Sequence, residues 1–508
     1  MPNLLDSQLA LLDWLIIAGY FAVIILIGVL ASRGTSDEEG FFLGQRRMPA
    51  WAVAMSFAAT ALSAATFIGG PEYAYKKDLT LLVYEVGKVL GAILVCALLL
   101  PPIYRAGCST VYGYLGQRVS PGASTAASAV FLLGRVLASG ARLFIAGTAF
   151  SYLLYDQLDQ ASLITAIIVF GTIGTLYTAL GGIKAVIWTD TLQLIIVVGA
   201  LLVSMFLLLG SIPLPIGEVV EVLRAESKTK LVETSTDLSR GDTLLAAFAL
   251  TFFYAAAFGT DHDMAQRLLT CKSLKQSIGS LLGATLIALP ITVLFLFTGL
   301  LLFVFYARPD VMGDAAPAMS VTDGREVYPQ YLLHELPIGL RGLAMAGLFA
   351  AAMSSLDSAI NAMASSAIGD VINPIRRRLG ATPKHTPEPS AGGSATASRA
   401  MVLVMGIVLT LSAIVMTLMY DKDQDALIPF ALGVMTFAYA GLMGVFLCVI
   451  LTGRGSTISV VAALTTGMAV IAASRYAPAV AGLGIAWPYW MVIGTMAGFG
   501  VCLLGRRR

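Results

Sequence analysis

The chain has 508 residues, of which 57% are hydrophobic and 12% charged, and its formal net charge is +2. Soluble domains carry about a quarter charged residues, so the composition excludes a soluble multidomain enzyme and predicts a surface that largely faces lipid. The small net charge gives no indication of a nucleic-acid partner. The five cysteines have neither metal-binding nor paired spacing, so we expect no disulfide or structural zinc.

Apolar runs long enough to cross a hydrocarbon core about 30 Å thick recur along the whole chain. They cover residues 11–31, 50–70, 80–104, 125–153, 161–180, 185–210, 243–260, 277–306, 337–369, 400–420, 427–452, 456–474 and 486–504. The runs are too long for barrel strands and do not alternate as such strands do. The sequence therefore predicts an all-α integral membrane protein with about 13 transmembrane helices. The first run has no basic region before it and no cleavage site after it, so we expect a retained anchor.

Basic residues in the short loops predict the orientation, because cytoplasmic loops carry an excess of Lys and Arg. With the N-terminus outside, the inside loops hold most of them, among them the three arginines that end the chain, whereas the outside ones lie mainly in two long loops, about 211–242 and 307–336. We therefore expect a multi-pass protein of a cell membrane, a bacterial inner membrane, with a cytoplasmic C-terminus. Residues 379–398, rich in Pro, Ser, Thr and Gly, are expected to form a flexible cytoplasmic linker.

Six charged residues fall inside the apolar runs, where a charge is costly and usually functional. They are Glu85, Lys88, Arg135, Arg142, Asp190 and Asp357. Internal pairing is the alternative explanation: Glu85 and Lys88 are three residues apart on one helix, and Arg142 could pair with Asp190. In either case, so many polar groups indicate a hydrated interior.

Hydroxyl-bearing and small residues crowd the run from 350 to 361. A helix here places four of them on one face, namely Ala351, Ser354, Ser355 and Ser358, with Asp357 nearby. Hydroxyl, carbonyl and carboxylate oxygens suit a hard cation such as Na⁺. Close helix packing through small residues is the alternative.

Two further segments favour the cation. Residues 51–71 are rich in small and hydroxyl side chains and are weakly helical in the middle, and residues 252–267 run from an apolar into a charged stretch. Many transporters bind cations at broken helices whose freed carbonyls face the ion.

Four stretches, residues 67–70 (FIGG), 181–190 (GGIKAVIWTD), 261–270 (DHDMAQRLLT) and 351–361, resemble the sodium/solute symporter family of sugar, proline, pantothenate and sialic-acid carriers. The resemblance implies a LeuT-like fold in a single transporter domain. Its two inverted five-helix repeats would span residues 50–210 and 243–452, after a leading helix at 11–31 and before two trailing helices within 456–504. It also implies sodium-coupled symport of a small polar organic solute by alternating access, and no enzymatic activity.

The resemblance further implies which residues bind the coupling ion, Na⁺. The principal sodium would be held by Ala59, Leu62, Ala351, Ser354 and Ser355. A second site would use Asp190 and Ser358, but this chain has Asp357 where family members with that site have serine. The second site therefore takes either another Na⁺ or a proton.

Solute contacts implied by the resemblance are Ser63, Thr66, Tyr84, Glu85, Lys88 and Tyr254. Sugar carriers have a small polar residue in place of Lys88, and a buried ammonium is a natural partner for a carboxylate. We therefore expect either a carboxylate-bearing solute or a sugar; the competing interpretation is that Glu85 already neutralises Lys88.

Other functions fit less well. An enzyme would need a catalytic cluster, but His262, His334 and His385 lie in separate loops and are expected to face solvent. The segment 261–263 (DHD) could ligate a metal, but the family resemblance implies that it is the loop after the sixth core helix. The chain has no Gly-rich phosphate-binding loop, which argues against ATP-driven pumping. A non-coupled channel or a solute sensor of the same fold is the remaining alternative. The sequence does not reveal the oligomeric state.

Overall fold

The computed structural model describes residues 9–32, 37–155, 159–317, 321, 324–379, 395–419 and 427–506. In these ranges ten helices are long and apolar enough to cross a membrane, or up to twelve if each of two bent pairs counts as one span. The shorter apolar helix α22 (Trp487–Leu503) follows them. This agrees with the predicted helix-only architecture; the predicted linker lies mostly outside the described residues.

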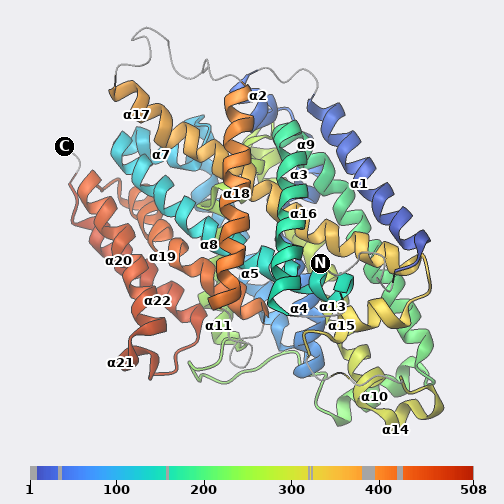
Figure 1. Cartoon of the computed structure of the whole chain (residues 1–508). Helices are drawn as coiled ribbons and strands as arrows, with labels where there is room; N and C mark the ends of the chain where they lie inside the picture. Colours follow the sequence, from blue (N-terminus) through green and yellow to red (C-terminus); the bar gives the residue numbers. More distant parts are fainter. Residues whose placement is uncertain are drawn as a thin grey trace.

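The helices pack side by side into one bundle (Figure 1). The membrane-length elements are α1 (Leu11–Ser32), α3 (Ala50–Ala61) with α4 (Ala64–Lys76), the stretch Thr80–Ala106 that contains α5 (Val83–Leu94), α8 (Pro121–Tyr155), α9 (Gln160–Ser211, which spans twice), α11 (Leu244–Gly259) with α12 (His262–Leu269), α13 (Leu274–Ala307), α16 (Leu340–Ser366), α18 (Ala395–Met419), α19 (Leu427–Thr452) and α20 (Thr457–Tyr476). Shorter helices connect them, including α7 (Val111–Arg118), α10 (Ile216–Ala225), α14 (Pro309–Met312), α15 (Val327–Gln330), α17 (Asn373–Arg378) and α21 (Pro478–Ala481).

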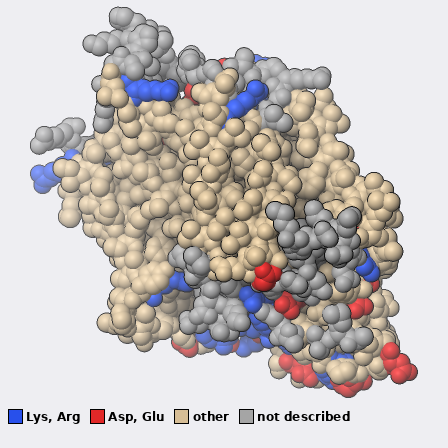
Figure 2. All heavy atoms as spheres, viewed as in Figure 1, with Lys and Arg blue, Asp and Glu red and all other residues tan. Residues whose placement is uncertain are grey.

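The outer surface of the bundle has the charge distribution of a membrane protein. On the face shown in Figure 2, Lys, Arg, Asp and Glu gather at the two ends of the molecule and leave a wide uncharged band between them. Large apolar side chains are exposed on the outward-facing helices, among them Leu286 and Phe206. Such a band matches the hydrocarbon core, where a charged side chain would be costly.

Helix α16 lies at the centre of the bundle and α1 at its edge. Of the most apolar 18 residues, 89% are buried in the span that contains α16, against 22% in α1. Small residues allow this central position, because they let helices approach closely. A Cβ added at Gly347 of α16 would lie 2.7 Å from the Cβ of Ala200 on α9.

Two spans are broken in the middle of the membrane-length stretch. The helices α3 and α4 meet at 57° around Leu62 and Ser63, and α11 and α12 meet at 57° around Thr260 and Asp261. A helix end frees its last carbonyls from intrahelical hydrogen bonds, so each break exposes backbone oxygens inside the protein. The weak helicity predicted for the middle of residues 51–71 is therefore confirmed.

A third break divides α9 at Gly182, whose φ of +58° is rarely adopted by other residues. A Cβ at this position would also lie 2.5 Å from the carbonyl oxygen of Phe41. Glycine is thus required here twice, by its backbone conformation and by the close approach. The break sets the direction of the second half of α9, which carries Asp190 toward α3 and α16.

Candidate functional site

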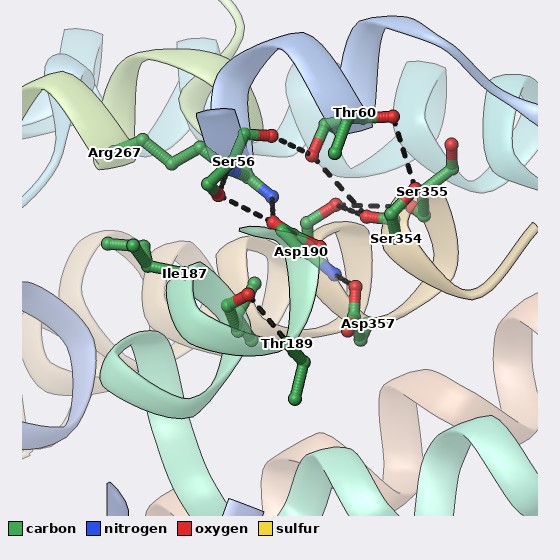
Figure 3. Close-up of polar contacts among 12 residues, drawn as sticks. Ser56, Thr60, Ile187, Thr189, Asp190, Arg267, Ser354, Ser355 and Asp357 are labelled. Atoms are coloured by element: carbon green, nitrogen blue, oxygen red, sulfur yellow. Dashed lines mark hydrogen bonds and ion pairs between the residues drawn. The ribbon is translucent and has the colours of Figure 1, made fainter. Parts of the chain in front are cut away.

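The break between α3 and α4 faces the serine-bearing side of α16. The Ser354 hydroxyl lies 3.2 Å from the carbonyl oxygen of Ala59 and 3.2 Å from that of Ala351, so its one hydrogen is shared between these two acceptors. The Thr60 hydroxyl reaches across to the Ser354 carbonyl at 3.4 Å, which joins the two helices a second time (Figure 3). Three of the five residues predicted for the principal sodium therefore meet at one point.

The other two predicted sodium ligands lie at the same junction. Leu62 is the first residue after α3 and has non-helical backbone angles. Ser355 is buried, and its hydroxyl has no hydrogen-bond partner among the described residues. An unsatisfied buried hydroxyl is costly, so this oxygen is suited to an additional ligand.

Asp190 forms an ion pair, but not with the predicted partner. Its Oδ2 lies 3.0 Å from Arg267 Nη2 and accepts a hydrogen bond from the Ser56 hydroxyl, and all three side chains are buried (Figure 3). The predicted pairing of Asp190 with Arg142 is therefore wrong. Sequence spacing did not reveal Arg267, because the break after α11 turns α12 back into the protein.

Asp357 is the neighbouring buried carboxylate on α16. It accepts hydrogen bonds from the Tyr177 hydroxyl and from the backbone N–H of Ser358. The Ser358 hydroxyl donates to the Ser354 carbonyl at 2.7 Å. No Lys or Arg of the described chain lies within 4.0 Å of the Asp357 carboxylate, so Asp357 differs from Asp190 in lacking a basic partner.

The turn into α12 is held by ion pairs and is not a metal centre. Asp261 and Asp263 both pair with Arg135, and Asp263 also pairs with Arg267 at 3.1 Å. His262 is fully buried, so the expectation that it faces solvent is wrong; His385 lies outside the described residues. Within the described ranges no three His, Cys, Asp or Glu side chains are grouped to hold a metal ion.

A cavity of about 90 Å³ opens beside the first break. It is lined by all six residues predicted to contact solute, namely Ser63, Thr66, Tyr84, Glu85, Lys88 and Tyr254. The cavity thus brings together residues from α4, α5, α11 and the connection between α3 and α4.

The charges of this cavity are unequally paired. Lys88 forms an ion pair with Glu85, which also accepts from the Thr292 hydroxyl at 2.9 Å. Arg142 lines the same cavity and is only 9% exposed, yet its guanidinium makes a single hydrogen bond to the described residues, from Nη2 to the Met435 sulfur at 3.5 Å. The sequence marked Arg142 as an intramembrane charge but not as a cavity residue; the signal available was its position in an apolar run.

The family model for the sodium:solute symporter family matches residues 41–467. The chain belongs to this family. It is therefore a sodium-coupled solute symporter, a multi-pass membrane transporter and not an enzyme, with Na⁺ as the coupling ion.

Two relatives and one solved structure illustrate the similarity. The chain is 26% identical over 490 residues to the sodium/sialic acid symporter SiaT of Proteus mirabilis, covering 96% of this chain and 93% of SiaT. It is 26% identical over 465 residues to human sodium-coupled monocarboxylate transporter 1, covering 90% and 72%. The solved structure of a Na⁺-coupled sialic acid symporter aligns with a TM-score of 0.81 at 23% identity, covering 97% of each chain. The chain therefore has the predicted LeuT-like fold.

Proposed function

We propose that the transported solute is an organic acid and that Arg142 binds its carboxylate. The observation that carries this proposal is the state of Arg142: it is buried, it lines the large cavity, and no described Asp or Glu lies within 4.0 Å of it. A buried cation is costly unless it is paired. A guanidinium is planar and matches a carboxylate with two parallel hydrogen bonds.

The other charged groups of the cavity favour the same solute class. Because Glu85 neutralises Lys88, these two contribute no net charge, and Arg142 leaves one excess positive charge in the lining. One excess positive charge suits a monoanion. The relatives named above carry sialic acid and monocarboxylates, which are acids of this kind. An acidic sugar or a short organic acid therefore fits the cavity better than a neutral sugar.

We further propose that the principal sodium binds between Ala59, Leu62, Ala351, Ser354 and Ser355. The hydroxyl contacts across the junction of α3 and α16 support this arrangement. Sodium bound there holds the broken helix against α16 and completes one wall of the cavity, since Ser63 follows Leu62 directly. Solute binding then permits closure and opening to the opposite side, and each ligand tightens the other by the same factor.

The second cation or proton is proposed to bind at Asp357, between Asp190 and Ser358. Asp190 is already neutralised by Arg267, so Asp357 is the carboxylate of this group that lacks a basic partner. Replacing Asp357 with serine is expected to change either the number of sodium ions per solute or the pH profile of uptake. If both were unchanged in proteoliposomes, the second site would be refuted.

The repeat boundaries and the orientation are also proposals. The two bent pairs, each at 57°, begin the segments 50–210 and 243–452, which supports inverted repeats over these ranges. Lys and Arg in the short loops support an external N-terminus and a cytoplasmic C-terminus in a bacterial inner membrane.

A panel of solutes tests the proposed substrate class directly. Purified protein is heated with sialic acid, pyruvate, lactate, glucose or proline, in NaCl or in choline chloride. A ligand stabilises the state that it binds, so a true substrate gives protection that depends on sodium. We expect carboxylates, and not glucose, to protect. Protection by neutral sugars and by no carboxylate would refute the acid proposal.

A further inference from the structure

A second, much smaller cavity shares lining residues with both the proposed sodium site and the solute cavity. Its volume is about 10 Å³, and its lining includes Ser63, Ser139, Arg142 and Ser355. Ser63 and Arg142 also line the large cavity. Ser355 belongs to the proposed sodium ligands. The small cavity therefore touches both proposed sites at once.

Three polar atoms of this lining have no hydrogen-bond partner among the described residues. They are Ser139 Oγ, Arg142 Nη1 and Ser355 Oγ, and their residues are 3%, 9% and 4% exposed. A buried polar group without a partner is destabilising, so three of them around one cavity indicate a bound polar species.

The size and the chemistry of the cavity point to one water molecule. A cavity of about 10–15 Å³ holds a single water, and a buried water makes about three hydrogen bonds. Arginine only donates, whereas a serine hydroxyl both donates and accepts. We propose that an ordered water accepts from Arg142 Nη1 and from the Ser355 hydroxyl and donates to Ser139 Oγ.

This water would link sodium binding to solute binding, an inference that rests on the proposed roles of Ser355 and Arg142. When the Ser355 oxygen faces a sodium ion, its proton points away from the cation and needs an acceptor. Arg142 cannot accept, but the water can. The water then fixes the guanidinium that faces the large cavity. Ser139 is neither one of the proposed sodium ligands nor in the lining of the large cavity, so we assign it the role of a positioning residue for both sites.

Sodium binding without any solute tests the water separately from the substrate class. The full chain is purified, and the Kd for Na⁺ is measured from thermal stabilisation in NaCl, with choline chloride keeping the ionic strength constant. We expect Ser139→Ala to raise this Kd about two- to tenfold, the effect of one buried hydrogen bond. Ser139→Thr, which keeps the hydroxyl, should restore the wild-type Kd.

A control variant on the same helix is Thr148→Val. The Thr148 hydroxyl donates to the backbone of Phe144 and lies outside the lining of the small cavity. Its Kd for Na⁺ should equal that of the wild type. An unchanged Kd in Ser139→Ala, with the variant folded and monodisperse, would overturn the proposal.

A double-mutant cycle identifies the shared contact. Because Ser139→Ala and Arg142→Met would remove partners of the same water, their effects on the Kd for Na⁺ should not multiply. Independent, multiplying effects would overturn the link, whereas a failed acid proposal would leave this result unaffected.

Replacing NaCl by sodium gluconate should leave the Kd unchanged. A Kd for Na⁺ that depends on chloride would show that the small cavity holds an anion, and the proposal of an ordered water would be refuted.

Discussion

Arg142→Gln removes the positive charge that we propose to bind the solute carboxylate and leaves a shorter, uncharged polar side chain. A hydrogen bond to a charged group contributes about 1.5–3 kcal/mol. The loss of one such bond corresponds to a decrease in affinity of about 10- to 150-fold, since about 1.4 kcal/mol is tenfold. Because no described carboxylate pairs with Arg142, the substitution leaves no acidic partner uncompensated. The fold should therefore tolerate it.

The assay is uptake of the best carboxylate from the solute panel into proteoliposomes, with Lys88→Gln as the matched comparison. Lys88 is paired with Glu85, so its loss should leave that carboxylate unpaired and lower thermal stability, with a smaller effect on the KM for the acid. Arg142→Gln should raise the KM strongly and leave thermal stability nearly unchanged. The opposite ranking, with carboxylate uptake lost only in Lys88→Gln, would refute the assignment to Arg142.

Two further predictions concern stability. Arg267→Met should lower the free energy of unfolding by about 3–5 kcal/mol, because it leaves Asp190 buried and unpaired. As the control, Arg308→Met removes an exposed ion pair and should lower it by less than about 1 kcal/mol. Equal melting temperatures for the two variants would contradict this prediction. In the connection before α11, burial opposes ionisation of Asp242. The hydrogen bonds from Arg240 and the charges of Lys77 and Arg240 outweigh burial and lower the pKa of Asp242 below its ordinary value. The ionised Asp242 therefore contributes its full stabilisation above about pH 4, and this stabilisation is lost as the pH falls through the lowered pKa. Asp242→Asn should be less stable than the wild type at pH 6 and should lose less stability on acidification. Melting temperatures that fall in parallel with pH for the two proteins would refute this prediction.

The span pattern could be predicted because lipid requires long apolar runs, and length alone identifies them. The breaks were harder. Small residues in 51–71 indicated the first, but α11 reads as one apolar run up to Gly259, and nothing local shows that α12 turns back into the protein. That turn buries His262 and brings Arg267 to Asp190. Both errors in the sequence interpretation come from this one geometric feature.

The candidate site was predictable where it depends on spacing within one helix. Glu85 and Lys88, three residues apart, form the ion pair that the sequence offered as an alternative. The role of Arg142 depends instead on which helix faces α8, and only the packed structure shows that no carboxylate of the described ranges pairs with it. Ser139 carries no sequence signal at all, since one serine in an apolar helix usually satisfies its hydroxyl on its own backbone.

The central claim is that Na⁺ binds between the break after α3 and the serines of α16. Sodium binding to the purified Ser354→Ala, Ser355→Ala double variant tests it most directly, with Ser365→Ala, about three turns along the same helix, as the control. We predict that the double variant loses sodium-dependent thermal stabilisation and ²²Na⁺ binding while the control keeps both. Wild-type sodium affinity in the double variant would contradict the account.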